Sequence, residues 1–134
     1  MRRAGGLSIA MALVLAACDG GGPQPGNLVV RLGHLSAAPP HTRAVKFRLV
    51  GPSSGVTAPT GSGLTVISAP LTGDTTIVAT FALASDTVDS RVIAVLAVPD
   101  VHAAGQYHAT LIEAAGLTYG LVAPSVYTLT VALQ

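Results

Sequence analysis

A two-residue alternation of apolar and polar side chains is the feature that most restricts the folds open to this chain. The clearest example is AVKFRLV at residues 44–50, in which Val45, Phe47 and Leu49 alternate with Lys46 and Arg48. Residues 126–133, VYTLTVAL, repeat the pattern with threonine on the polar side. Successive side chains of a β-strand point to opposite faces, so a period of two predicts a strand with one buried face. Both segments are therefore predicted strands, and Lys46 and Arg48 are expected to face solvent.

Six further segments have strand-like patterns between turn signals. They are residues 28–35, 64–68, 75–83, 91–98, 106–114 and 117–122. The third places Ile77, Ala79, Phe81 and Leu83 on one face. The fourth, RVIAVLAV, is apolar on both faces, as a central strand covered on both sides would be. Eight short strands separated by turns predict an all-β fold, a two-sheet antiparallel β-sandwich. A helix over residues 103–115 is the alternative, but Gly105 and the alternation in YHATLI argue against it.

The N-terminal residues have the parts of a secretory signal. Arg2 and Arg3 precede an apolar run over residues 7–17 that ends in small side chains. The run is shorter than the roughly 20 residues that a membrane-spanning helix needs. A helical signal peptide over residues 1–17 is therefore expected.

Leu15-Ala16-Ala17-Cys18 resembles the lipobox of bacterial lipoproteins. The resemblance implies cleavage before Cys18, a diacylglyceryl group on its thiol and acylation of the new amino terminus. It also implies a protein of the bacterial cell envelope, held by lipid to a membrane at its periplasmic or extracellular face. An ordinary cleaved signal followed by an unrelated cysteine is the alternative. Residues 18–26 would then form the lipidated cysteine and a flexible Gly/Pro tether, and residues 27–134 the folded domain.

Composition narrows the range of partners. Charged residues make up 10% of the chain, against about 25% in an average soluble domain. Removal of Arg2 and Arg3 with the signal leaves five basic and six acidic residues, a net charge of −1. Such a chain has no basic field to attract nucleic acid. It has two phenylalanines, three tyrosines and no tryptophan, which disfavours a sugar-binding surface of stacked rings.

The order of the predicted strands resembles that of the cohesin-like branch of β-sandwiches. The segments that carry the resemblance are NLVVRL, AVKFRLVGP, VIAVLAVPD, YHATLIEAA and YTLTV. It implies a sandwich in which one sheet face docks a helical partner, as in cohesins. The immunoglobulin-like pattern is a weaker match, because its Cys…Trp…Cys core is missing.

Residues 51–55, GPSSG, match the G-x-S-x-G pattern of serine hydrolases, with Ser53 at the centre. That pattern needs a strand before it and a helix after it, whereas VTAPTGSG follows. A turn is the simpler interpretation.

Histidines and acidic residues give no complete metal pattern. Asp100 and His102 would share a face in an extended segment, with His108 further along, but a metal site needs three or four ligands. Asp86 and Asp89 are expected to be solvated loop carboxylates. Glu113 is expected to be exposed, or to pair with Arg31, Arg48 or Arg91 if it is buried.

These features together favour a lipid-anchored, non-enzymatic β-sandwich that binds a partner or forms part of an envelope structure. No metal or cofactor is expected. Lys46 and Arg48 are the candidate contact surface for an envelope protein. The alternative from another class is a small envelope hydrolase or metal-dependent enzyme that uses Ser53, or His102 with His108. A third possibility is a sensor or assembly accessory whose sandwich merely holds a position near the membrane.

Overall fold

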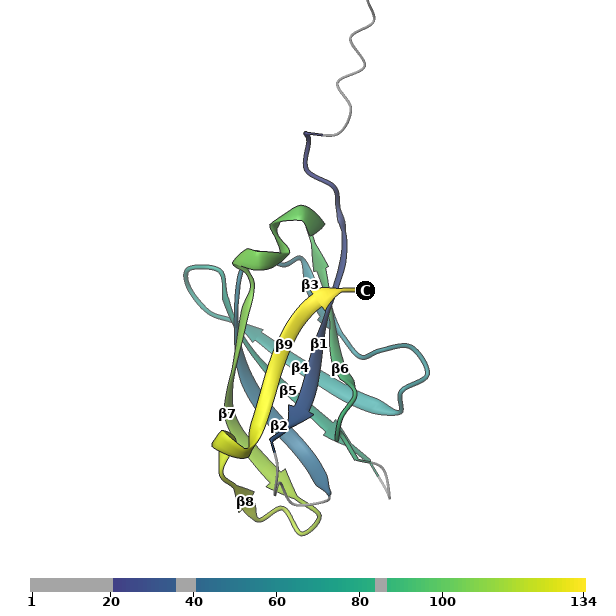
Figure 1. Ribbon diagram of the computed structural model, residues 1–134, viewed down its shortest axis with the longest axis vertical. Coiled ribbons are helices and arrows are strands. Elements are labelled where there is room, and N and C mark those ends of the chain that lie inside the picture. The colour runs from purple at the N-terminus through teal and green to yellow at the C-terminus, as the bar shows by residue number, and fades with distance from the viewer. Residues whose placement is uncertain (1–20, 36–40, 84–86) are drawn as a thin grey trace, which may run out of the picture.

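The computed structural model describes residues 21–35, 41–83 and 87–134. Cys18 and the rest of the lipobox, like Asp86, therefore lie outside the described residues. Within them, nine strands form two antiparallel sheets, which confirms the predicted all-β sandwich (Figure 1).

One sheet has four strands in the order β3-β6-β1-β9. Their bounds are β3 (Gly55–Thr57), β6 (Val92–Val98), β1 (Gly26–His34) and β9 (Tyr127–Leu133). The other sheet has five strands in the order β4-β5-β2-β7-β8. Their bounds are β4 (Leu64–Pro70), β5 (Thr75–Ala82), β2 (Thr42–Val50), β7 (His108–Gly116) and β8 (Leu121–Val122). Two 3-10 helices, η1 (Val101–Gln106) and η2 (Pro124–Val126), precede β7 and β9.

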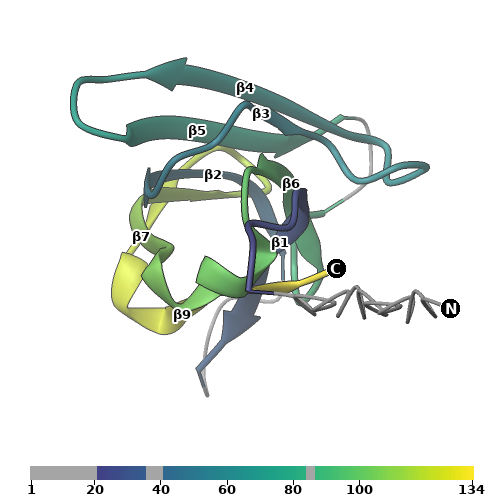
Figure 2. The ribbon, with the colours of Figure 1, turned by 90° about the horizontal axis from the view of Figure 1, so that it is seen from above.

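The core lies between the facing sides of the two sheets. Phe47 and Leu49 of β2 are fully buried, as are Leu28 and Leu32 of β1. The alternation in these strands therefore predicted the buried side correctly. Figure 2 shows that the layers also approach at their edges, where β3 lies beside β4 and β7 beside β9.

Strand β5 shows that alternation alone does not say which face is buried. Its core side chains are Val78, Thr80 and Ala82, so Ile77, Ala79 and Phe81 point outward. The register with β2 sets this choice, because Val78 lies opposite the buried Phe47. Thr80 is tolerated inside because its hydroxyl donates a hydrogen bond of 3.0 Å to the Ile93 carbonyl.

Two other segments differ from the sequence prediction, and a third confirms it against its alternative. The short strand β3 lies within residues 51–63, for which the sequence predicts a turn and a loop. A strand of three residues is too short to show a period of two. The predicted strand over residues 106–114 is confirmed by β7, and the alternative of a helix over 103–115 is wrong, because a short 3-10 helix ends at Gln106. The predicted strand 117–122 is reduced to the two residues of β8, since a turn occupies its first part.

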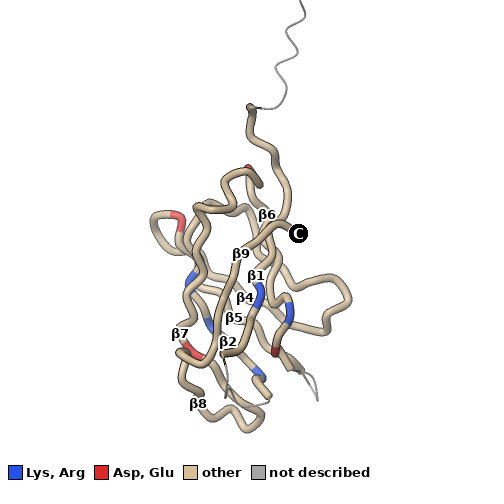
Figure 3. Tube along the Cα trace, in the orientation of Figure 1, with Lys and Arg blue, Asp and Glu red and all other residues tan. Residues whose placement is uncertain are grey.

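The two ends of the domain are distinct. Residues 21–25 leave the sandwich at the end that carries η1, and η2 and β8 lie at the opposite end (Figure 1). Charged residues are few and scattered along the trace, with long uncharged stretches between them (Figure 3).

Candidate functional site: the outer faces of the two sheets

Lys46 and Arg48, the predicted contact pair, point outward from β2 on the five-stranded sheet. Lys46 Nζ lies 2.8 Å from Glu113 Oε2 of the neighbouring strand β7. The strand register places these two residues directly opposite each other. Glu113 is 52% exposed, which confirms the expected exposure. Arg48 is exposed and has no ion-pair partner among the described residues. The face therefore carries one matched pair and one unmatched cation.

Apolar side chains surround this charged pair. A shallow hollow of about 140 Å³ lies beside Lys46 and Glu113, where the small side chains of Ala44, Ala79 and Ala115 leave space next to Phe81 and Leu121. Leu121 is 79% exposed and Ile67 of β4 is 58% exposed. The outer face of an ordinary antiparallel sheet is polar, so these side chains are unusual for a strand face that meets only water.

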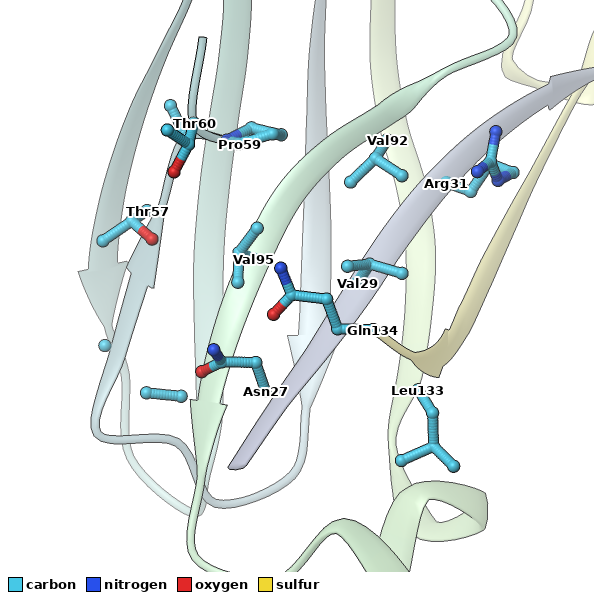
Figure 4. A pocket seen from close by; sticks show the side chains of 13 residues that line it. Asn27, Val29, Arg31, Thr57, Pro59, Thr60, Val92, Val95, Leu133 and Gln134 are labelled. Atoms are coloured by element: carbon cyan, nitrogen blue, oxygen red, sulfur yellow. The ribbon is translucent and has the colours of Figure 1, made fainter. Parts of the chain in front are cut away.

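A larger hollow, of about 570 Å³, lies on the outer face of the four-stranded sheet (Figure 4). Val29 of β1 and Val92, Val95 and Ala97 of β6 contribute apolar side chains to it. Residues 57–60, at the end of β3 and just after it, line one side. Further lining residues are Asn27, Arg31, Leu133 and Gln134. Strand β6 creates this surface because it is apolar on both faces.

The expectation that β6 would be covered on both sides holds for one side only. Its inner side chains, including Ile93 and Leu96, are fully buried, whereas Val92, Val95 and Ala97 are partly exposed in the hollow. The sequence contained the signal for this hollow in RVIAVLAV. The sequence of residues 57–60, which lie in a loop rich in Pro, Gly and Thr, does not predict that they lie beside β6.

At the end of the sandwich near η2, four residues form a polar network. Asp89 accepts two hydrogen bonds, of 2.9 and 3.0 Å, from the Thr42 backbone N–H. Its carboxylate also lies 3.3 Å from His34 Nε2. The hydroxyls of Thr42 and Tyr127 are 2.6 Å apart and buried. Asp89 was expected to be solvated, which is wrong: its side chain is 14% exposed, because the Thr42 amide needs an acceptor.

Asp100 organises the other end of the domain. Its carboxylate accepts hydrogen bonds from the backbone N–H groups of Gln24, at 3.2 Å, and His102, at 3.0 Å. These two donors hold the pKa of Asp100 below its usual value. Val101 N–H in turn donates to the Gln24 carbonyl at 2.8 Å. The condition under which Asp100 and His102 would share a face, an extended segment, is not met, because Asp100 is the N-cap of η1.

The candidate hydrolase and metal residues do not assemble within the described part of the chain. Ser53 lies in a turn between β2 and β3, so a strand follows it and not a helix. No described hydrogen bond joins Ser53 to a histidine. His102 Nδ1 lies 3.4 Å from Asp100, and His108 is exposed at the start of β7. The described residues contain no group of three or more His, Cys, Asp or Glu side chains placed to share a metal ion.

Tyr107 packs beside the Ser53 turn. Its hydroxyl donates a hydrogen bond to the Pro52 carbonyl. Burial raises the pKa of Tyr107, and the nearby charges of Asp74 and Asp100 act in the same direction. Tyr107 therefore fixes the turn in place as a neutral side chain.

No family model, curated protein or solved structure matches this chain. Among the described residues, no helix combines the length and the apolar character that crossing a bilayer requires.

Proposed function

We propose that this chain is a lipid-anchored, non-enzymatic β-sandwich of the bacterial cell envelope that works by binding a partner or as part of an envelope structure. The anchor would be Cys18, on the resemblance of residues 15–18 to a lipobox. Residues 21–25 leave the domain at the end that carries η1, so an anchor there would leave both outer sheet faces open. This arrangement suits a domain that is held at a membrane and presents its surface.

The observation that carries the proposal is the apolar character of the outer sheet faces. Ile67 and Leu121 are more than half exposed on one sheet, and three valines line the hollow on the other. Exposed apolar patches of this kind mark surfaces that bind something. On the five-stranded sheet, Lys46 and Arg48 are the polar contacts we propose for an envelope protein. The resemblance to cohesin-like sandwiches, in which a sheet face docks a partner, favours the same use.

The anchor is tested by replacing the one cysteine. With Cys18→Ser we expect the protein to leave the membrane fraction, or its uncleaved precursor to accumulate, because the lipid-bearing sulfur is lost. The measurement is membrane flotation together with the mass of the mature N-terminal peptide. Ser8→Ala, in the apolar run of the signal, is the matched control and should fractionate as the parent does. Unchanged flotation of the Cys18→Ser chain, with an unmodified N-terminus in the parent, would refute the anchor.

A further inference from the structure

The hollow on the four-stranded sheet is apolar along its floor and has a cation at one end. Val29 lies opposite Val95 in the strand register, and Arg31 lies opposite Val92. Arg31 is exposed and lines the hollow, and none of the lining side chains is acidic. A ligand with an apolar body and an anionic head would match both properties.

The cationic end is not neutralised by a described neighbour. Arg31 has no ion pair with any residue that the structure describes. Its neighbour Arg91, whose carbonyl accepts from Leu32 N–H, directs its guanidinium to the carbonyls of Thr87 and Ser62. The Arg91 guanidinium is therefore hydrogen-bonded within the domain, whereas the Arg31 guanidinium is available to bind a carboxylate.

The backbone beneath the hollow explains why the ligand should be a hydrocarbon and not an extended peptide. Strands β6 and β1 are both internal to their sheet, so their backbone groups are already paired with neighbouring strands. A peptide laid across them would find few free partners for its own N–H and C=O groups. An alkyl chain needs none, and its burial over Val29, Val95 and Ala97 is favourable.

We propose that this hollow binds a medium-chain fatty carboxylate, with its chain along β1 and its carboxylate at Arg31. Asn27 and Arg31 are four residues apart, roughly 13 Å in a strand. An extended alkyl chain advances roughly 1.25 Å per carbon with bonds near 1.5 Å, so about ten carbons span the distance. The hollow, at about 570 Å³, falls within the range of small-molecule sites. The site lies within the folded domain and does not depend on lipid at Cys18.

The test uses the purified full chain in lipid nanodiscs and a decanoate that carries a photoreactive diazirine near its methyl end. Crosslinked positions are read by mass spectrometry. We expect them to fall at the Asn27 end of the hollow, in residues 27–29, 55–57 and 95–97, and to be competed by decanoate more effectively than by decanol. Arg31→Gln should lower the labelling at least fivefold, because the head loses its charge-assisted hydrogen bonds. Arg48→Gln, the matched arginine on the other sheet, should leave it within twofold.

A second pair of variants tests the apolar floor. Val95→Thr keeps the side-chain shape, adds a hydroxyl in the hollow and should lower the labelling about fivefold. Val50→Thr, on the outer face of the other sheet, is the matched control and should leave the labelling unchanged. The proposal is overturned if labelling is spread over both sheets, if Arg31→Gln leaves it unchanged, or if decanol competes as well as decanoate. A dimer of the purified chain that Val95→Thr dissociates, measured by analytical ultracentrifugation, would instead indicate an interface between copies at this face and would also overturn it.

Discussion

Gly51 shows how a single residue can fix a turn that the sequence pattern leaves open. It follows β2 with a φ of +133°, a region that L side chains rarely adopt. A Cβ at this position would overlap the Tyr107 ring, and the Gly51 N–H donates to the Asp74 carbonyl at 2.8 Å. The first glycine of the G-x-S-x-G match, Gly51, is therefore required by the close approach of Tyr107, a structural reason unrelated to a hydrolase.

Gly51→Ala is expected to lower the free energy of unfolding by about 2–4 kcal/mol, from backbone strain and from the clash with Tyr107. Gly105→Ala is the matched control, because no atom lies within 4 Å of its added Cβ. The control should be neutral, or stabilising by up to about 1 kcal/mol. Denaturant unfolding of both variants measures the difference. Equal midpoints would show that Tyr107 moves aside without cost.

At the scale of elements, two buried hydroxyl contacts connect the sheets in addition to apolar packing. Thr80 of β5 bonds to the Ile93 carbonyl of β6, and Thr42 of β2 shares a hydrogen bond with Tyr127 of β9. Each contact joins a strand of one sheet to a strand of the other. Because such bonds have defined geometry, they help to fix how the sheets face each other.

Tyr127→Phe is expected to lower the free energy of unfolding by about 1–2 kcal/mol, since it leaves the buried Thr42 hydroxyl without its Tyr127 partner. Tyr119→Phe is the matched control: Tyr119 is 64% exposed, and we expect a change within about 0.5 kcal/mol. Chemical denaturation monitored by circular dichroism measures both. A Tyr127→Phe chain as stable as the control would mean that the Thr42 hydroxyl finds another hydrogen-bond partner.

The elements also show how far the sequence could predict the fold. Strands β1 and β2 were predictable with their buried faces, because charged side chains mark the outer side of each. The face of β5 was not, since it has no charged side chain and its register with β2 decides. Strand β3 was too short to show a pattern. Lys46 and Arg48 were correctly placed on an outer face, but their partner Glu113 and the hollow over Val29 and Val95 depend on strand pairing across long sequence separations.

For the whole molecule, the important contact joins the segment before β1 to the loop after β6. Gln24 is bonded through both its N–H and its carbonyl, to Asp100 and Val101. The sequence suggested a solvated tether up to Gly26, because glycine and proline dominate it. The backbone N–H groups of a segment rich in glycine and proline can still donate hydrogen bonds, and here the Asp100 carboxylate is placed to accept one. The folded domain thus reaches two residues further toward the N-terminus than strand β1 does.

This contact predicts a response to acid. The lowered pKa of Asp100 means that its carboxylate form favours the folded arrangement, so the contact is complete above the usual pKa of 3.8 and is lost as the pH falls through a lower value. We expect the Gln24 and His102 amide resonances to shift together with a midpoint below 3.8 in an NMR titration. Asp100→Asn should abolish the shared transition. A midpoint at or above 3.8 would contradict the observed hydrogen bonds.

The bonded Gln24 also sets a length scale for the proposed anchorage. Six residue steps separate Cys18 from Gln24, so even a fully stretched chain extends only about 20 Å. Acyl chains on Cys18 would thus keep η1 close to the lipid headgroups. Molecules would then enter the valine-lined hollow sideways, along the bilayer surface, and those that already diffuse in the membrane plane would meet it most often.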